Sequence, residues 1–131
     1  MSIDAVDLGA GAKSVAFVYV SDRERALGFY RDTLGFAVHS SDNYGDYLSI
    51  PGSLLRLTVI PDMKPHPHPV VGFEVSDVVS VVKAFRERGV VMDTFEGMDQ
   101  DDLGIWHAPD GRSKLAFFKD ADGNALMLTQ A

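Results

Sequence analysis

Two stretches of the chain carry the same pattern of apolar and polar positions. Residues 15–22 read VAFVYVSD and residues 70–77 read VVGFEVSD, so each apolar run closes on Val-Ser-Asp. Runs rich in β-branched and aromatic residues predict buried strands. The two Asp residues are 77 − 22 = 55 positions apart in a chain of 131 residues. One structural unit is therefore repeated, with one copy in each half.

Apolar residues then recur at helical spacing in both halves. In the first half Leu27, Tyr30 and Leu34 predict a helix over residues 22–34, which Gly35 ends. Ser21 to Glu24 matches a capping box, with Ser21 as the N-cap residue. In the second half, a helix that Gly89 ends is predicted from four apolar positions: Val78, Val81, Val82 and Phe85.

Short strands bounded by turn residues should follow each helix. They are predicted over residues 36–40, 44–50 and 54–60, and then over residues 90–94, 105–108, 114–119 and 125–129. Residues 61–69 read PDMKPHPHP, which favours an extended linker. The expected fold is α+β, a single domain over 1–131 of two βαβββ modules, about 14–60 and about 70–131. One helix covers one face of each sheet, so the other face needs a cover, and two curved sheets enclosing a cavity are the natural result.

Three segments resemble the vicinal oxygen chelate superfamily, which includes glyoxalase I, extradiol dioxygenases, fosfomycin-resistance enzymes and bleomycin-resistance proteins. They are VAFVYVSDRERALGFYRDTLGF near the start, VVGFEVSD at the middle and FFKDADGNALML at the end. The last segment has Ala121 where proline is common in the family. The resemblance implies the two-module fold, whereas the family's functions are diverse.

The resemblance also implies four metal-ligand positions at the floor of the cavity. In this sequence they align to Val15, Val70, Arg56 and Met127. Valine offers no donor, a guanidinium has no lone pair to give, and a thioether is too soft for hard divalent ions. We therefore expect no metal and no other cofactor.

Strand alternation from these positions supplies candidate ligand-binding residues. They form an apolar and aromatic pocket with a few polar groups, which is typical of small-molecule sites. The predicted ligand-binding set, which includes the only tryptophan, is Phe17, Tyr19, Arg56, Thr58, Glu74, Trp106 and Met127. Each has an alternative role: Arg56 and Glu74 can pair with each other, and the apolar members can be plain core.

Other candidate groups are weaker. His39 or His107 could act as a general base if it faced the cavity, and His66 with His68 lacks a third metal ligand nearby. Residues 96–104 read EGMDQDDLG, an acidic segment that predicts either a mobile lid or an ordinary polar loop. The sequence contains neither a nucleophile elbow nor a phosphate-binding glycine loop.

Composition narrows the partners. The net charge of −7 disfavours nucleic acid and would suit a cationic ligand. No apolar run reaches the ~18 residues of a membrane span. The absence of cysteine suits a reducing cytoplasm, and the first 13 residues lack the pattern of a secretory signal. Exposed sheet edges in so short a chain favour a homodimer.

These observations favour a metal-independent protein that holds a small, partly aromatic organic molecule between its modules. This reading resembles the bleomycin-resistance type of sequestering protein. The alternative is a glyoxalase-like lyase, isomerase or dioxygenase. It would act by acid/base chemistry or with a metal site that the alignment misses.

Overall fold

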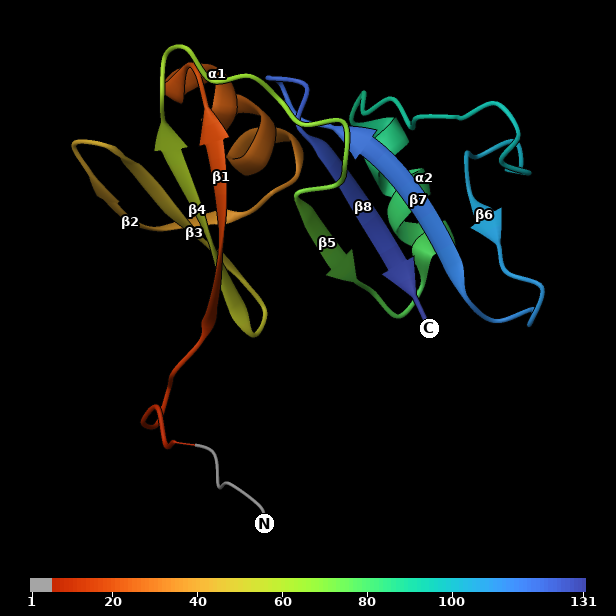
Figure 1. Ribbon diagram of the computed structural model, residues 1–131, viewed down its shortest axis with the longest axis horizontal. Helices are drawn as coiled ribbons and strands as arrows, with labels where there is room; N and C mark the ends of the chain where they lie inside the picture. The colour runs from red at the N-terminus through yellow and green to blue at the C-terminus, as the bar shows by residue number, and fades with distance from the viewer. Residues whose placement is uncertain (1–5) are drawn as a thin grey trace.

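The computed structural model describes residues 6–131, which form two four-stranded sheets (Figure 1). The first sheet has the order β1-β4-β3-β2 and the second β5-β8-β7-β6. In each sheet the first pair is parallel and the other pairs are antiparallel. The predicted α+β fold is confirmed. The strands are β1 (Ser14–Val20), β2 (Ala37–Asp42), β3 (Gly45–Ile50), β4 (Ser53–Val59), β5 (Val71–Glu74), β6 (Trp106–His107), β7 (Lys114–Lys119) and β8 (Ala125–Gln130).

The helix of the first module begins one residue later than the capping-box pattern indicates. Asp22 is the N-cap residue, and its side chain accepts a hydrogen bond from the backbone N–H of Arg25. The prediction of Ser21 as the cap was wrong, because its hydroxyl donates to Asp122 in the other module. Helix α1 (Arg23–Leu27) continues into a π-helical turn, η1 (Gly28–Thr33). Gly35, at φ +85°, then takes the chain out of the helix.

The second module matches its prediction except in one segment. Helix α2 (Val78–Glu87) begins after the N-cap Asp77, whose side chain accepts a hydrogen bond from the backbone N–H of Ser80. Residues 90–94 are not a strand, and only Met92 forms an isolated bridge, to Phe118. Asp93 explains part of this, because its carboxylate pairs with Lys119 and its carbonyl accepts from Gln100. The Gln100 side chain thus takes the Asp93 carbonyl, while the Asp93 N–H still bonds to the backbone of Phe117.

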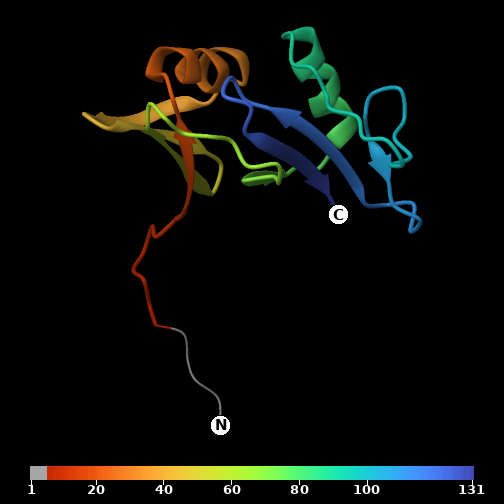
Figure 2. The same cartoon turned by 45° about the horizontal axis from the view of Figure 1, so that its top comes forward.

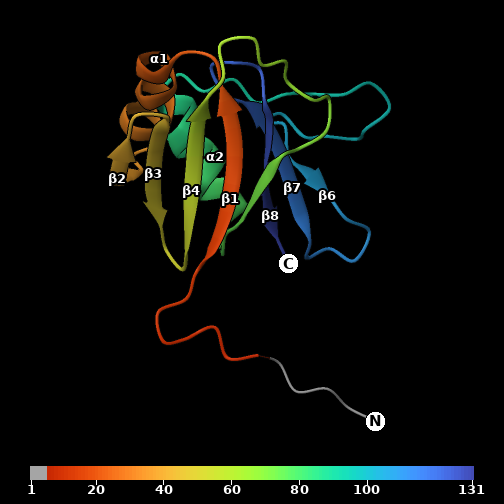
Figure 3. The same cartoon turned by 60° about the vertical axis from the view of Figure 1, so that its left-hand side comes forward.

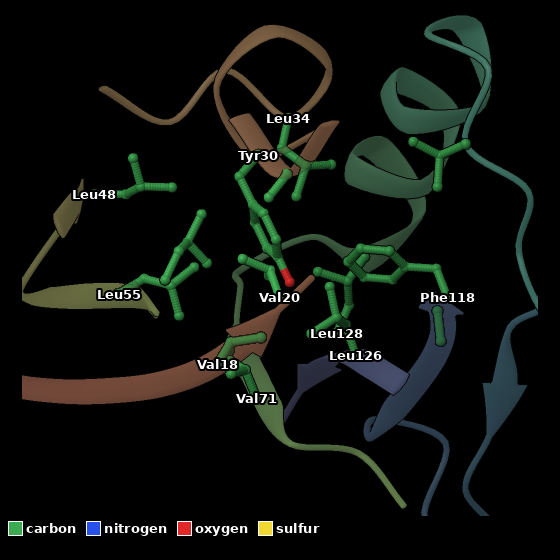
Figure 4. Close-up of a cluster of buried hydrophobic side chains, with 14 of the residues drawn as sticks. Val18, Val20, Tyr30, Leu34, Leu48, Leu55, Val71, Phe118, Leu126 and Leu128 are labelled. Carbon is green, nitrogen blue, oxygen red and sulfur yellow. The ribbon is translucent and has the colours of Figure 1, made fainter. Parts of the chain in front are cut away.

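Both helices lie on the same side of the two sheets (Figures 2 and 3). Alternate strand residues point to that side and close one core that both modules share (Figure 4). Aromatic contacts cross between the modules, from Phe29 to Phe118 and from Phe36 to Phe73. Fully buried members of this core include Val18, Tyr30, Leu48, Leu55, Phe118, Leu126 and Leu128.

A tight turn between β7 and β8 fastens the second module to the first. Buried Asp120 accepts a hydrogen bond of 2.6 Å from the hydroxyl of Tyr30. Asn124 donates to the backbone carbonyl of Tyr19, and Arg25 pairs with Asp122 at 2.9 Å. Burial, followed by the charge of Asp120, raises the pKa of the Tyr30 hydroxyl far above its usual range. The hydroxyl therefore stays a donor at every pH the protein meets.

Residues 61–69 connect the modules as an exposed segment without helix or strand. The edge strands β1 and β5 face each other where the two sheets meet (Figures 1 and 3). Within residues 6–131, none of the helices combines the length and the apolar character needed to cross a membrane.

Candidate functional site

The side of each sheet that faces away from the helices is called here its open face. On the first sheet the register sets Phe17 beside Arg56 and Arg56 beside Tyr47 on neighbouring strands. Tyr19 and Thr58 are paired two residues further along the same face. Phe17 is 62% exposed and Tyr19 53% exposed. Four of the seven predicted site residues thus share this open face.

Arg56 is held rigidly on that face although its side chain is almost fully buried. It is 7% exposed. Its Nη2 donates to Asp42 Oδ1 at 2.9 Å and its Nε to Thr58 Oγ1 at 3.3 Å. The guanidinium carbon lies 4.7 Å from the ring centroid of Tyr47, in range of a cation–π interaction. Three neighbours therefore fix the orientation of one cation.

The side chain of Asp42 is also held in place. Its Oδ1 also accepts from the backbone N–H groups of Tyr44 and Gly45. The hydrogen bond from Arg56, followed by that from Tyr44, lowers the pKa of the Asp42 carboxyl below its usual value. A pair between Arg56 and Glu74 was the alternative expected from sequence. That pair does not form, because Arg56 pairs with Asp42 on its own sheet.

The open face of the second sheet carries the other three predicted residues. Met127 lies between Gly72 and Phe117, and Glu74 follows two residues along on the edge strand β5. Trp106 pairs with Leu115 on the short strand β6. Phe95, from the loop after α2, packs edge-on against Phe117 at 5.3 Å between ring centroids. This face is chiefly apolar and aromatic.

A cavity of about 710 Å³ opens where the β1 and β5 edges meet. Its wall is mostly apolar and includes Phe36, Phe73 and Phe85 from the helix side. Glu74 is the one residue of the predicted set that lines it. The other six lie on the open faces to either side.

Register explains the residues that the sequence analysis missed. Pro51 and Gly52 form a two-residue turn between Ile50 and Ser53, which are paired. Counting three residues back and three forward from that pair joins Tyr47 to Arg56. The sequence held this signal, since hairpin loop length sets register. The contact of Asp42 with Arg56 depends on the side chain's path and has no such signal.

The histidines and the acidic loop lie elsewhere. His107 is on the face of its strand opposite to Trp106, where it contacts Asp101 Oδ2 at 2.8 Å. Burial alone would raise the pKa of Asp101, but hydrogen bonds from His107 and from two backbone N–H groups outweigh it and lower the pKa. Gln100 bonds to the backbone at Asp93, Phe95 and Gly104, which orders this loop. His39, His66 and His68 are all exposed.

Comparison with protein families gives a match over residues 12–128 to the Glyoxalase/Bleomycin resistance protein/Dioxygenase superfamily. The chain belongs to this superfamily. The resemblance inferred from sequence is thereby confirmed. Comparison with curated proteins gives no match to this chain.

Solved structures with the same fold cover nearly the whole chain. TnmS3, an antibiotic binding protein from Streptomyces sp. CB03234, is 25% identical with a TM-score of 0.64, covering 95% of this chain and 98% of its own. A superfamily member from Sphaerobacter thermophilus DSM 20745 is 25% identical with a TM-score of 0.68, covering 92% and 98%. One from Alicyclobacillus acidocaldarius is 16% identical with a TM-score of 0.68, covering 95% and 94%, and shows the fold alone.

The residues present do not fit the metal that many glyoxalase-superfamily members use. Val15 lies on the open face beside Leu54, and the backbone of Val70 bonds to Ala125. Arg56 and Met127 occupy the matching positions on β4 and β8. Within the described residues 6–131, no three His, Cys, Asp or Glu side chains gather as metal ligands would. A cation therefore meets a guanidinium, a thioether and two aliphatic side chains here, and none of these attracts it.

Proposed function

We propose that this chain is a metal-independent binding protein that holds a small, partly aromatic organic molecule between its two modules. The observation that carries the proposal is the make-up of the open faces. The positions where the superfamily places metal ligands hold Val15, Val70, Arg56 and Met127, and aromatic side chains surround them. Exposed Phe17 and Tyr19 on one sheet and Trp106 on the other offer flat apolar surface to a ring.

The relative TnmS3 supports this proposal. It is described as an antibiotic binding protein, and it shares 25% identity over nearly the full length of both chains. The whole chain then acts as one domain, with the ligand spanning the two modules. The absence of cysteine agrees with a cytoplasmic location.

Metal analysis of the purified protein is the first test. We expect less than about one-tenth of an equivalent of Ni, Zn, Fe or Mn after purification without chelator. Stoichiometric metal, retained on dialysis, would overturn the proposal and favour a glyoxalase-like enzyme instead.

Ligand screening is the second test. Thermal shift against planar aromatic compounds should find molecules that stabilise the protein, since a ligand that binds only the folded state raises its free energy of unfolding. Trp106→Ala should reduce that shift by removing a stacking surface. Val91→Ala, an exposed apolar residue outside the candidate site, is the matched control and should leave the shift unchanged. Equal shifts in both variants would count against this site.

We also propose a homodimer, because exposed aromatic side chains on an open sheet face are costly in a monomer. Phe17 and Tyr19, both on the edge strand β1, are more than half exposed on the open face of the first sheet. Light scattering coupled to gel filtration should give twice the chain mass of 14.3 kDa. A monomeric mass at ~0.1 mM would contradict the dimer and leave the binding proposal intact.

A further inference from the structure

One buried side-chain nitrogen on the open face of the first sheet has no hydrogen-bond partner among the described residues. Nη1 of Arg56 is buried, and among residues 6–131 it finds no hydrogen-bond acceptor. It is the one buried side-chain nitrogen or oxygen in this part of the chain with that property. Leaving a buried donor unpaired is destabilising, and more so for a charged group.

The surroundings explain why the guanidinium stays where it is. Asp42 and Thr58 bond its Nη2 and Nε, and the ring of Tyr47 lies against its plane. These contacts already fix the orientation of Nη1. Binding of a ligand oxygen there would therefore cost little conformational entropy. The neighbouring side chain in register is Phe17, which is 62% exposed. A donor and an aromatic ring thus sit side by side on one face.

We propose that Arg56 recognises an oxygen acceptor on the aromatic ligand, either a carboxylate or a carbonyl, through its unpaired Nη1. The inference rests on the proposed function and names the class of ligand for the same site. The guanidinium lies at a position where the superfamily places a metal ligand. It supplies a fixed positive group for a ligand oxygen.

The net charge of −7 points the other way, toward a cationic ligand, and magnitudes decide between the two. Scattered surface charges act through salt water, where interactions fade over ~8 Å at physiological ionic strength. A direct hydrogen bond from a buried, charged guanidinium is stronger than one between neutral groups. The local donor therefore outweighs the diffuse field.

Asp42 sharpens the choice further. Its carboxylate already balances the charge of Arg56, so the ligand need not carry a full negative charge. A neutral carbonyl satisfies the donor equally in geometry, and a carboxylate adds Coulomb attraction. An ammonium group has no acceptor for Nη1 and is repelled by it.

Entry of the ligand requires the side chains over Nη1 to move. Nη1 has almost no solvent-exposed surface in the described conformation. Exposed side chains change rotamer within nanoseconds, and Phe17 stands next to Arg56 on the edge strand. We expect its ring to swing aside and then pack on the bound ligand.

Three naphthalene probes test the inference with one ring and three substituents. They are 2-naphthoate, 2-acetonaphthone and 2-naphthylmethylammonium, each titrated into the full-length protein by calorimetry or equilibrium dialysis. We expect the carboxylate and the ketone to bind at least tenfold more tightly than the ammonium. The ratio between the first two tells whether charge or the hydrogen bond alone selects the ligand.

Variants of Arg56 then assign the effect to its donor. Arg56→Met keeps an apolar stem and should weaken naphthoate about 10- to 100-fold. Arg56→Lys keeps the charge without the Nη1 position, so it should weaken the ketone as much as Arg56→Met does. Arg112→Met, an exposed arginine in a surface turn, should change neither. Circular dichroism and melting curves confirm that each variant is folded.

The NMR signals of the Arg56 side-chain nitrogens test the inference on the wild-type protein, without a variant. Naphthoate should shift and sharpen them, whereas the ammonium probe should not.

Each outcome has a separate meaning. Ammonium binding as tight as naphthoate, or naphthoate binding unaffected by Arg56→Met, overturns the acceptor inference while aromatic binding stands. Failure of all three probes to bind wild-type protein at millimolar concentration overturns the proposed function and this inference together.

Discussion

The two modules share apolar core positions on their buried faces, with one polar exception, and differ in character on their open faces. Leu55 on β4 and Leu126 on β8 hold equivalent places beside the parallel edge strand, and both are fully buried. One residue further, on the open face, the first module has Arg56 and the second has Met127. The neighbouring strand adds Tyr47 in one case and Phe117 in the other.

This difference shows that packing against the helices constrains the buried faces and not the open faces. The buried faces pack against helices at close to crystal density, so apolar residues dominate there. The open faces do not pack against helices. The open face of the first sheet is polar around Arg56, and that of the second sheet is apolar around Met127. A ligand that spans both would place its oxygen on the first sheet and its rings toward the second.

The largest expected effect tests the equivalence of the buried faces. Leu55→Ala and Leu126→Ala should each lower the free energy of unfolding by about 2–5 kcal/mol, because each leaves a cavity in the shared core. Urea denaturation followed by circular dichroism measures both. The two losses should lie within about 1 kcal/mol of each other, and Leu8→Ala, at an exposed position, should cost less than about 0.5 kcal/mol. A loss in only one module would break the comparison.

A smaller effect distinguishes the modules on their buried faces. Asp46 is buried in the first module where the second has Ala116, and Arg23 and Ser41 bond its carboxylate. Burial would raise the pKa of Asp46, but the hydrogen bonds from Arg23 and Ser41 outweigh it and lower the pKa from its ordinary 3.8. A carboxyl with a lowered pKa in the folded state stabilises that state above its unfolded-state pKa. This stabilisation disappears as the pH falls through the lower, folded-state pKa.

Asp46→Asn should therefore cost about 1.5–3 kcal/mol at pH 7, the range for hydrogen bonds to a charged group. The difference from wild type should shrink once the pH drops below about 4. Urea titrations at pH 7, 5, 4 and 3 follow it. Asp62→Asn in the exposed linker is the control and should show no such convergence. A constant difference at every pH would show that the carboxylate charge plays no part.

The smallest expected effect concerns the open face. Arg56→Met makes the first module resemble the second at this position and should change the free energy of unfolding by less than about 1 kcal/mol. It removes an ion pair with half-exposed Asp42, but it also removes a buried donor that has no partner in the described residues. A loss above about 3 kcal/mol would mean that Arg56 is retained for stability, and would weaken the case for a ligand.

Much of the fold followed from the sequence because its signals are local. The repeated Val-Ser-Asp, the helical spacing and the turn residues act over a few positions each. The prediction for residues 90–94 failed for the opposite reason: their β-branched residues predicted a strand, but the side chain of Gln100, outside the segment, takes the carbonyl of Asp93. Ser21 failed as a cap because Asp122, about a hundred residues away, bonds its hydroxyl.

The same distinction between local signals and long-range contacts applies to the candidate site. Arg56 and Met127 could be named in advance from the family resemblance, and Trp106 as the only tryptophan on a short predicted strand. Strand alternation from the aligned positions then supplied Phe17, Tyr19, Thr58 and Glu74. Their function as a ligand site stays a prediction. Only the tertiary structure paired Arg56 with Asp42 and not with Glu74, and only it left Nη1 without an acceptor in the described residues. Alternation is a property of one strand, whereas the partner of a long side chain depends on how strands and turns come together in space.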